Sequence, residues 1–480
     1  MQKTYGNRPS NIYQSLFSLV LLCTAQFMLV LDFSIVNVAL PSIQQSLGFS
    51  PQHLQWVVSA YSLTFGGFLL LGGRAADLFG RRRLFLLGLG VFTLASLMGG
   101  FSQSQAILIA ARAVQGLGAA IVAPAILAIV LSTFQEDAKR SRALGALGAM
   151  AAGGFAAGVL LGGLLTDSLG WRWVMFVNVP IGLALMVSTP FLLRDSRVAT
   201  VRRQLDLAGA VVVTLGLMLL VYVLVQIPEV GWATPATALK SVGAIALFAL
   251  FIWIESHVSV PLVPLHIFGQ RSLMAANQVA TLVSAIGASM VFILTLYIQQ
   301  VLHYTAFQTG LAFLPHAIAA VVAAPLSSHL VHRTTVKFTL MIGLILSLIG
   351  LLRLTTISIN STFVQDLLPG TVLVGLGMVT CFVTVTIAAT AGVEDHEQGL
   401  VSGLLNTFQQ VGSAIGLAVV IAIATARANS LLVGASASSE TLLSASVKGF
   451  QAALCTSAGF AAFGILITVM TIRNSKKQDI

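Results

Sequence analysis

The chain has 480 residues, of which 57% are hydrophobic and only 8% are charged. Soluble globular chains carry about 25% charged residues, so this composition excludes an ordinary soluble protein and indicates an integral membrane protein. The net charge of +10 would suit a nucleic-acid-binding protein, but the positions of the basic residues favour another explanation.

Fourteen apolar stretches are long enough to cross a bilayer, because about 20 helical residues span the hydrocarbon layer. They predict spans near 14–36, 54–73, 84–101, 106–130, 142–165, 172–193, 205–226, 237–255, 273–298, 308–330, 338–357, 367–391, 399–425 and 449–472. The predicted fold class is therefore an all-α membrane protein with 14 transmembrane helices. The first stretch is too long for the apolar core of a cleaved signal peptide, so we expect it to remain as a span.

Lysines and arginines gather at one set of span ends, which is typical of cytoplasmic loops. These residues are Lys3, Arg8, Arg74, Arg81, Arg82, Arg83, Lys139, Arg140, Arg142, Arg194, Arg197, Arg202, Arg203, Arg271, Arg333, Lys337, Arg473, Lys476 and Lys477. The opposite side holds only Arg172, Lys240, Arg427 and Lys448. This distribution predicts that both termini are cytoplasmic, and it explains the positive charge as a topology signal rather than a nucleic-acid surface.

Asp32 is the only carboxylate well inside a first-half span, and it lies near the predicted outer end of that span. Burial disfavours an ionised carboxylate and a neighbouring arginine favours it. A site that alternates between wet and dry surroundings can therefore take up and release protons. The alternative is that Asp32 caps the helix at the outer membrane surface and takes no part in coupling.

The segment 73–83 between the second and third spans reads GRAADLFGRRR. Gly73 and Gly80 predict a tight cytoplasmic turn. Asp77 at its centre can lie against a helix N-terminus or an arginine and hold the cytoplasmic side shut. Alternatively, Arg81, Arg82 and Arg83 only retain the loop in the cytoplasm.

The fourth stretch contains Arg112 and Gln115 between apolar residues. An arginine inside a membrane helix costs about 2.5–3.5 kcal/mol even on insertion scales, so it must face a wet cavity or a partner. Gly116 and Gly118 let another helix approach closely. We expect Arg112 to lie on a transport pathway; the alternative is a structural arginine that extends to the nearest interface.

Gly154, Gly158 and Gly162 recur at a spacing of four residues and are followed by Gly163. This spacing places the first three on one face of the fifth span, which predicts close packing against another helix. A gating role would be added to that packing role.

Glycines of the first half recur about 258 residues later: Gly116, Gly118, Gly145, Gly154 and Gly158 correspond to Gly375, Gly377, Gly403, Gly412 and Gly416. The repeat predicts six-helix bundles over 1–204 and 257–480, with two additional helices over 205–256. Parallel halves with a site between them are typical of transporters.

The repeat places Asp32 near Met290 and Arg112 opposite Gly370 or Thr371, so the charged residues are concentrated in the first half. The second half offers neutral polar and aromatic candidates for a ligand surface, namely Asn406, Phe408, Gln409 and Gln410. We therefore expect coupling in the first half and much of the ligand surface in the second.

Four segments together resemble the major facilitator superfamily, in its branch of 14-span drug:proton antiporters. They are the first-span segment 31–41, the loop 73–83, the fourth-span segment with Arg112 and 115–118, and the glycine pattern 154–163 that marks antiporters in this superfamily. The resemblance covers nearly the whole chain. It departs at Val159, where antiporters usually carry proline, so the kink or rigidity that a proline supplies is missing there.

The resemblance implies a monomeric proton-coupled antiporter that exports lipophilic cationic or neutral drugs across a bacterial cytoplasmic membrane. It implies no enzymatic activity, no metal and no cofactor, since the proton gradient drives transport; the partners are amphipathic small molecules, protons and the lipid bilayer. The chain lacks a G-x-x-x-x-G-K-[ST] motif, which argues against ATP as the direct energy source. The alternatives are a transporter of a dedicated metabolite, lipid or siderophore and, more remotely, a membrane-embedded enzyme or channel.

Overall fold

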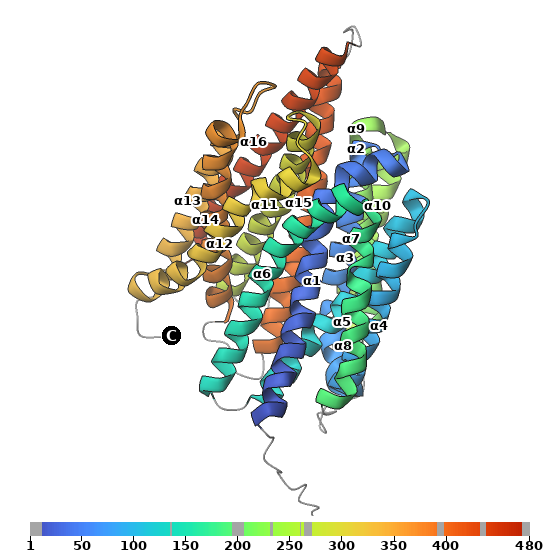
Figure 1. Ribbon diagram of the computed structural model, residues 1–480, viewed down its shortest axis with the longest axis vertical. Coiled ribbons are helices and arrows are strands. Elements are labelled where there is room, and N and C mark those ends of the chain that lie inside the picture. The colour runs from blue at the N-terminus through green and yellow to red at the C-terminus, as the bar shows by residue number, and fades with distance from the viewer. Residues whose placement is uncertain are drawn as a thin grey trace, which may run out of the picture.

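The computed structural model describes residues 12–134, 137–193, 206–230, 234–259, 261–263, 271–390, 398–432 and 438–472. These residues form long helices joined by short connections (Figure 1). Within them, 14 helical segments are long and apolar enough to cross a membrane. The predicted all-α class with 14 spans is confirmed. Helices suit this setting because each backbone hydrogen bond is made inside the segment, where lipid offers no partner.

The first half of the chain contains α1 (Ile12–Leu47), α2 (Pro51–Leu54), α3 (Trp56–Phe79), α4 (Arg81–Gly100), α5 (Gln105–Thr133), α6 (Asp137–Leu169), α7 (Arg172–Phe176) and α8 (Asn178–Leu192). Two helices follow, α9 (Leu207–Val230) and α10 (Pro235–His257). The second half contains α11 (Arg271–Gln300), α12 (Ala306–Arg333), α13 (Val336–Leu354), the π-helical turn η2 (Phe363–Leu367), α14 (Leu368–Thr390), α15 (Gln398–Leu432) and α16 (Ser439–Thr471).

Helix α1 is longer than the sequence indicated, because it ends at Leu47 rather than near residue 36. The polar Asn37 does not end the helix, since its side-chain amide donates to Phe33 O at 2.8 Å, one helical turn back. Pro41 is also accommodated inside α1. The expectation that Asp32 lies near the end of its span is therefore wrong: Asp32 lies near the middle of α1.

The connection between α3 and α4 is a single residue. Gly80 has a φ of 104°, and its N–H donates to Ala76 O at 3.1 Å. Only glycine adopts such a backbone conformation without strain. The sequence predicted a turn over 73–83, but residues 73–79 continue α3 and residues 81–83 begin α4. The expected turn is thus reduced to Gly80.

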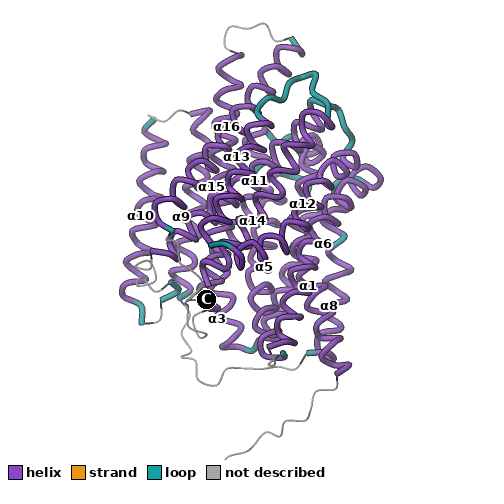
Figure 2. The backbone as a smooth tube through the Cα atoms, turned by 90° about the vertical axis from the view of Figure 1, so that its left-hand side faces the viewer, coloured by secondary structure: helices purple, strands orange, loops and turns teal. Residues whose placement is uncertain are grey.

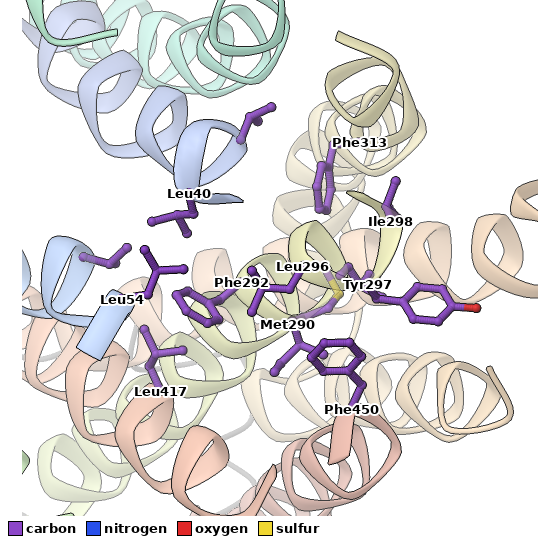
Figure 3. Close-up of a cluster of buried hydrophobic side chains, with 14 of the residues drawn as sticks. Leu40, Leu54, Met290, Phe292, Leu296, Tyr297, Ile298, Phe313, Leu417 and Phe450 are labelled. Carbon is purple, nitrogen blue, oxygen red and sulfur yellow. The ribbon is translucent and has the colours of Figure 1, made fainter. Parts of the chain in front are cut away.

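We define two ends of the bundle by residues that lie there. The Gln44 pole contains the C-terminal ends of α1, α6 and α11 and the start of α12; the Arg81 pole contains the turn between α3 and α4. At the Gln44 pole one apolar core joins both halves: Leu40 and Leu54 of the first half face Phe292 and Leu417 of the second (Figure 3).

Toward the Arg81 pole this single core divides. One buried cluster contains first-half residues such as Phe85 and Ile126. Another contains mainly second-half residues such as Leu340 and Val401, with Phe68 of α3 partly buried against it. The two halves are therefore joined most completely at the Gln44 pole.

The additional helices α9 and α10 have unequal surroundings. Helix α9 packs against both α3 and α15, and Gly67 of α3 leaves the space that Thr214 of α9 occupies. Helix α10 packs on α9 and lies at the edge of the bundle (Figure 2). The pair is thus attached to both halves through α9. The proposed domain boundaries at 204 and 256 stay predictions.

Candidate functional site

A buried polar cluster lies at the middle of the first half, around Asp32 of α1. The Asp32 Oδ2 atom accepts from Arg112 Nη1 at 2.8 Å, and this pair is also an ion pair. The Oδ1 atom accepts from Gln115 Nε2 at 2.7 Å and from Asn178 Nδ2 at 2.8 Å. Asp32 is 0% and Arg112 is 1% exposed. The alternatives that placed either residue at a membrane interface are therefore wrong.

Arg112 has further partners on α3 and α5. Its Nε donates to Val57 O at 3.0 Å, and Nη1 donates to Gln115 Oε1 at 2.6 Å. The guanidinium carbon lies 4.4 Å from the centre of the Tyr61 ring, which is cation–π distance. A buried charge is tolerated only when it is paired and hydrogen-bonded, and Arg112 meets that condition through three helices.

Two members of this cluster were missed in the sequence. Asn178 begins α8 and donates to Asp32; Ser96 of α4 accepts from Gln115 Nε2 at 2.6 Å. Both are fully buried. Asn178 lies at the start of the sixth span, close to Pro180, and Ser96 lies among apolar residues with no distinctive pattern. Only the fold brings these residues to Asp32.

The hydrogen bonds of this cluster depend on the protonation state of the Asp32 carboxyl. All three donors to Asp32 need an acceptor oxygen, and a protonated carboxyl turns one of its oxygens into a donor. A proton on Asp32 would therefore compete with the contacts to Arg112, Gln115 and Asn178. Those three residues lie on α5 and α8, so the contacts of Asp32 attach α1 to both helices.

The glycines of α6 position α1 and so position Asp32. A Cβ atom on Gly154 would lie 2.8 Å from Phe27 O, and one on Gly162 would lie 2.7 Å from Ile35 O. At Gly158 it would lie 2.8 Å from Leu31 O, next to Asp32. Only glycine allows α6 to lie this close to α1, as the spacing predicted.

Gly163 is turned toward the other half. A Cβ atom there would lie 2.5 Å from Ala306 O at the start of α12. In the same region Asp167 accepts from the N–H groups of Ala306 at 3.1 Å and Phe307 at 2.8 Å. A carboxylate at a helix N-terminus is stabilised by the helix dipole. Helix α6 therefore joins α1 on one side and the second half on another.

Residues of the predicted gating loop anchor the Arg81 pole. Arg81 donates to Ala128 O at 3.0 Å, and Arg82 donates to the carbonyl of Leu193, directly after α8, at 3.2 Å. Arg83 is exposed, and Gly73 lies against Pro124 of α5. The side chain of Asp77 lies outside the described part of the chain, so its predicted contact with a helix end or an arginine stays a prediction.

The second-half candidates do not join the Asp32 cluster. Asn406 is exposed, and its side chain donates to Ser402 O on its own helix at 2.9 Å. Gln409 is buried, whereas Phe408 and Gln410 are half-buried. Gln410 lies against Gly66 of α3, where a Cβ atom would meet its Cβ at 2.8 Å. These residues lie on α15, at or beside its contact with α3.

Two glutamines close the Gln44 pole between the halves. Gln299 of α11 donates to Val38 O at 2.9 Å, and Gln300 donates to Gln44 Oε1 at 2.9 Å. They line an open cleft of about 840 Å³ together with Asp167 and His303. The cleft is lined by both polar and apolar side chains and is open to the surface at this pole.

Known proteins match this chain over most of its length. The family model of the Major Facilitator Superfamily matches residues 22–417. The chain belongs to the Major Facilitator Superfamily. Members of this superfamily are transporters and not enzymes, as the sequence resemblance implied.

Several relatives are export or resistance proteins. The cephamycin export protein CmcT of Amycolatopsis lactamdurans is 40% identical over 87% of this chain and 86% of its own length. The puromycin resistance protein pur8 of Streptomyces alboniger is 37% identical over 92% and 88%. The multidrug resistance protein Stp of Mycobacterium tuberculosis is 37% identical over 82% and 73%.

Solved structures agree with the fold. A bacterial homologue of the human lysosomal transporter Spinster, in an inward-facing and unoccupied conformation, aligns with a TM-score of 0.69 and 14% identity, covering 98% of this chain and 100% of that one. At this identity the likeness concerns the fold alone. Together with the 14 apolar helices, it identifies this superfamily member as a multi-pass membrane protein.

Proposed function

We propose that this chain exports drug-like small molecules across a bacterial cytoplasmic membrane in exchange for protons. The names of its relatives support the export of antibiotics and other drugs. The observation that carries the proton-coupling part is the fully buried Asp32–Arg112 pair, which crosses between α1 and α5. Charged groups inside membrane spans are functional by default, because an isolated charge there is too costly to keep.

The Arg81 pole faces the cytoplasm in this proposal, because basic residues accumulate at that pole. The Gln44 pole then faces outward and is closed by Gln44, Gln299 and Gln300. In this arrangement the described state has its outer side sealed. Drug reaches the protein from the cytoplasm or the inner leaflet, and the proton reaches Asp32 after the Gln44 pole opens.

Exchange follows if drug and proton favour different arrangements of the halves. A ligand shifts such an equilibrium only by its differential affinity for the two states. A proton on Asp32 breaks contacts to α5 and α8, so protonation favours one arrangement of α1; loss of the proton restores the cluster. No metal or cofactor takes part in these steps.

A dedicated exporter of one compound is a second candidate. It is favoured by relatives whose names carry a single compound, namely cephamycin and puromycin. Such a protein would share the fold and the Asp32 cluster, and it would differ in the range of molecules accepted.

Inverted membrane vesicles test the proposal. Vesicles that carry the wild type, Asp32→Asn or the control Asp366→Asn are energised, and ethidium uptake and proton efflux are followed together. We expect ethidium-dependent proton efflux in the wild type and the control, and its loss in Asp32→Asn at equal protein levels. Ethidium movement without proton flux would contradict coupling. A folded wild type that ignores ethidium would favour the dedicated exporter.

A further inference from the structure

A second buried group of charges lies where the additional helices meet α3. Asp206 immediately precedes α9, Glu255 lies in the last turns of α10, and Arg74 lies near the C-terminal end of α3. Asp206 and Glu255 are each only 3% exposed. The group is separate from the Asp32 cluster, which shares none of its residues, and the transport proposal does not use it.

In each carboxyl, one oxygen accepts a hydrogen bond from a backbone N–H and the other oxygen accepts none. Asp206 Oδ1 accepts from Gly209 N at 2.7 Å, and Glu255 Oε2 accepts from Val263 N at 3.2 Å. Asp206 Oδ2 and Glu255 Oε1 are buried and accept no hydrogen bond from a donor. A buried acceptor without a donor costs about 1–3 kcal/mol, and more if it is charged.

A proton shared between the two carboxyls would account for both unpartnered oxygens. Glu255 and Asp206 interact electrostatically with each other, and both interact with Arg74. Two ionised carboxylates are both acceptors and cannot bond, whereas one proton placed between them supplies the missing donor. Two ionised carboxylates that interact in a buried site also repel each other, and one shared proton removes that repulsion.

The balance of charge among Arg74, Asp206 and Glu255 also favours one proton on the two carboxyls. Arg74 interacts electrostatically with both carboxyls and donates from Nη1 to Pro261 O at 3.0 Å. Among these three described side chains, one guanidinium faces two carboxyls. With one shared proton the three side chains sum to zero charge, whereas two ionised carboxylates leave an excess negative charge in a buried site.

We propose that Asp206 and Glu255 bind one proton between them and form a proton site distinct from Asp32. Because the pair joins the entry of α9 to the end of α10 and faces α3, its protonation fastens the additional helices to the first half. Loss of the proton leaves two negative carboxylates in contact and loosens that junction. The ionisable groups that face the pair among the described residues are those of Arg74 and of the pair itself.

Infrared spectroscopy of the purified full-length protein tests this site directly. At neutral pH the wild type is expected to show the C=O stretch of a protonated carboxyl, which is lost on titration to alkaline pH. Part of this signal should be absent from Glu255→Gln and should remain in Asp32→Asn and in Glu440→Gln, whose carboxyl is on the exposed first turn of α16. An unchanged signal in Glu255→Gln would overturn the proposal.

Asp206→Asn provides a second variant if Glu255→Gln folds poorly. It removes one of the two charges and leaves Glu255 facing Arg74, so we expect the same part of the signal to disappear. Thermal unfolding gives an independent readout: the wild type should lose stability between neutral and alkaline pH, and Glu255→Gln should lose less. Equal losses in both proteins would overturn the proposal, whatever the outcome of the vesicle experiment.

Discussion

The two halves of this transporter share their packing but not their chemistry. Gly116 of α5 lies against Tyr61 O of α3, and Gly375 of α14 lies against His316 O of α12 in the same manner. Gly154 and Gly158 hold α6 on α1, as Gly412 and Gly416 hold α15 on α11. The close helix contacts of one bundle are therefore rebuilt in the other.

These contacts align the two sites residue by residue. Gly158 lies on Leu31 and Gly416 lies on Ala285, so Asp32 corresponds to Ile286. The sequence repeat placed it near Met290, which is wrong by one helical turn, because the offset of α1 and α11 differs from that of α6 and α15. Arg112 corresponds to Thr371, one of the two predicted positions.

The second-half site is accordingly almost apolar. Ile286 and Val374 replace Asp32 and Gln115, and both are 0% exposed. His316 replaces Tyr61 and bonds Thr371 O at 3.1 Å through Nδ1. The comparison teaches that in this chain the close glycine contacts recur in both halves, whereas the buried ion pair occurs in one half and the packing of the other half is built without it. The ion pair is kept in one half for another reason, which we assign to coupling.

The largest effect is expected from breaking the buried pair. Arg112→Ala leaves Asp32 charged and uncompensated, and such a change costs about 3–5 kcal/mol. The double variant Asp32→Leu/Arg112→Met imitates the apolar second-half site and should regain most of the loss, because a packed apolar pair replaces a buried ion pair well. It should nevertheless transport nothing.

Unfolding in detergent measures these free energies, and vesicle uptake measures transport. An Arg112→Ala protein as stable as the wild type would contradict the pairing. A double variant that still moves protons with drug would contradict the functional assignment.

Glycine substitutions should affect both halves alike. The equivalent substitutions Gly154→Val and Gly412→Val each place a side chain against the backbone of the facing helix. Overpacking of this kind costs about 1–3 kcal/mol. Gly153→Val is the matched control, because nothing lies within 4 Å of its Cβ position. The free energy of unfolding of the three variants tests this symmetry; a large loss in one half alone would argue against equivalent packing.

A smaller effect is expected at His316. His316→Phe keeps the ring that faces Phe155 and removes one buried hydrogen bond, at a cost of about 1 kcal/mol. Because the second-half site carries no ion pair in its described residues, drug-dependent proton flux should remain. Flux lost in His316→Phe at unchanged stability would place coupling in both halves.

The smallest effect is expected at the contact between the halves. Asp167→Asn removes the charge that faces the N-terminus of α12, which is worth about 0.3–1 kcal/mol. The fraction of protein molecules that are open at the Gln44 pole should therefore increase. Labelling of a cysteine introduced at Ser42, in the cleft, measures this shift. Asp366→Asn is the control, since Asp366 accepts from Thr362 N within its own half. Equal labelling of the two variants would contradict a role of Asp167 in holding this pole closed.

Much of the fold could be predicted because its signals are local in sequence. Apolar length gave the spans, and the four-residue glycine spacing gave the face of α6 that meets α1. The sequence predicted too early an end for α1, because Asn37 and Pro41 are residue types that often follow a helix. The hydrogen bond of Asn37 to its own helix and the packing of Pro41 are visible only in the structure.

The site was predicted only in part. Asp32, Arg112 and Gln115 are conspicuous because charge and amide groups are rare in apolar spans. Asn178 and Ser96 are 146 and 64 positions from Asp32, and nothing in the sequence joins them. The pairing of Asp206 with Glu255 also depends on how α9 and α10 return to α3, which neither periodicity nor composition specifies.

Drug-induced proton release by the purified protein tests the central claim most directly. The protein is placed in weakly buffered detergent solution with a pH-sensitive dye, ethidium is added, and the protons released per protein are counted. The account predicts release from the wild type and His316→Phe and none from Asp32→Asn. Release from Asp32→Asn equal to that of the wild type would contradict the assignment of coupling to the first-half cluster.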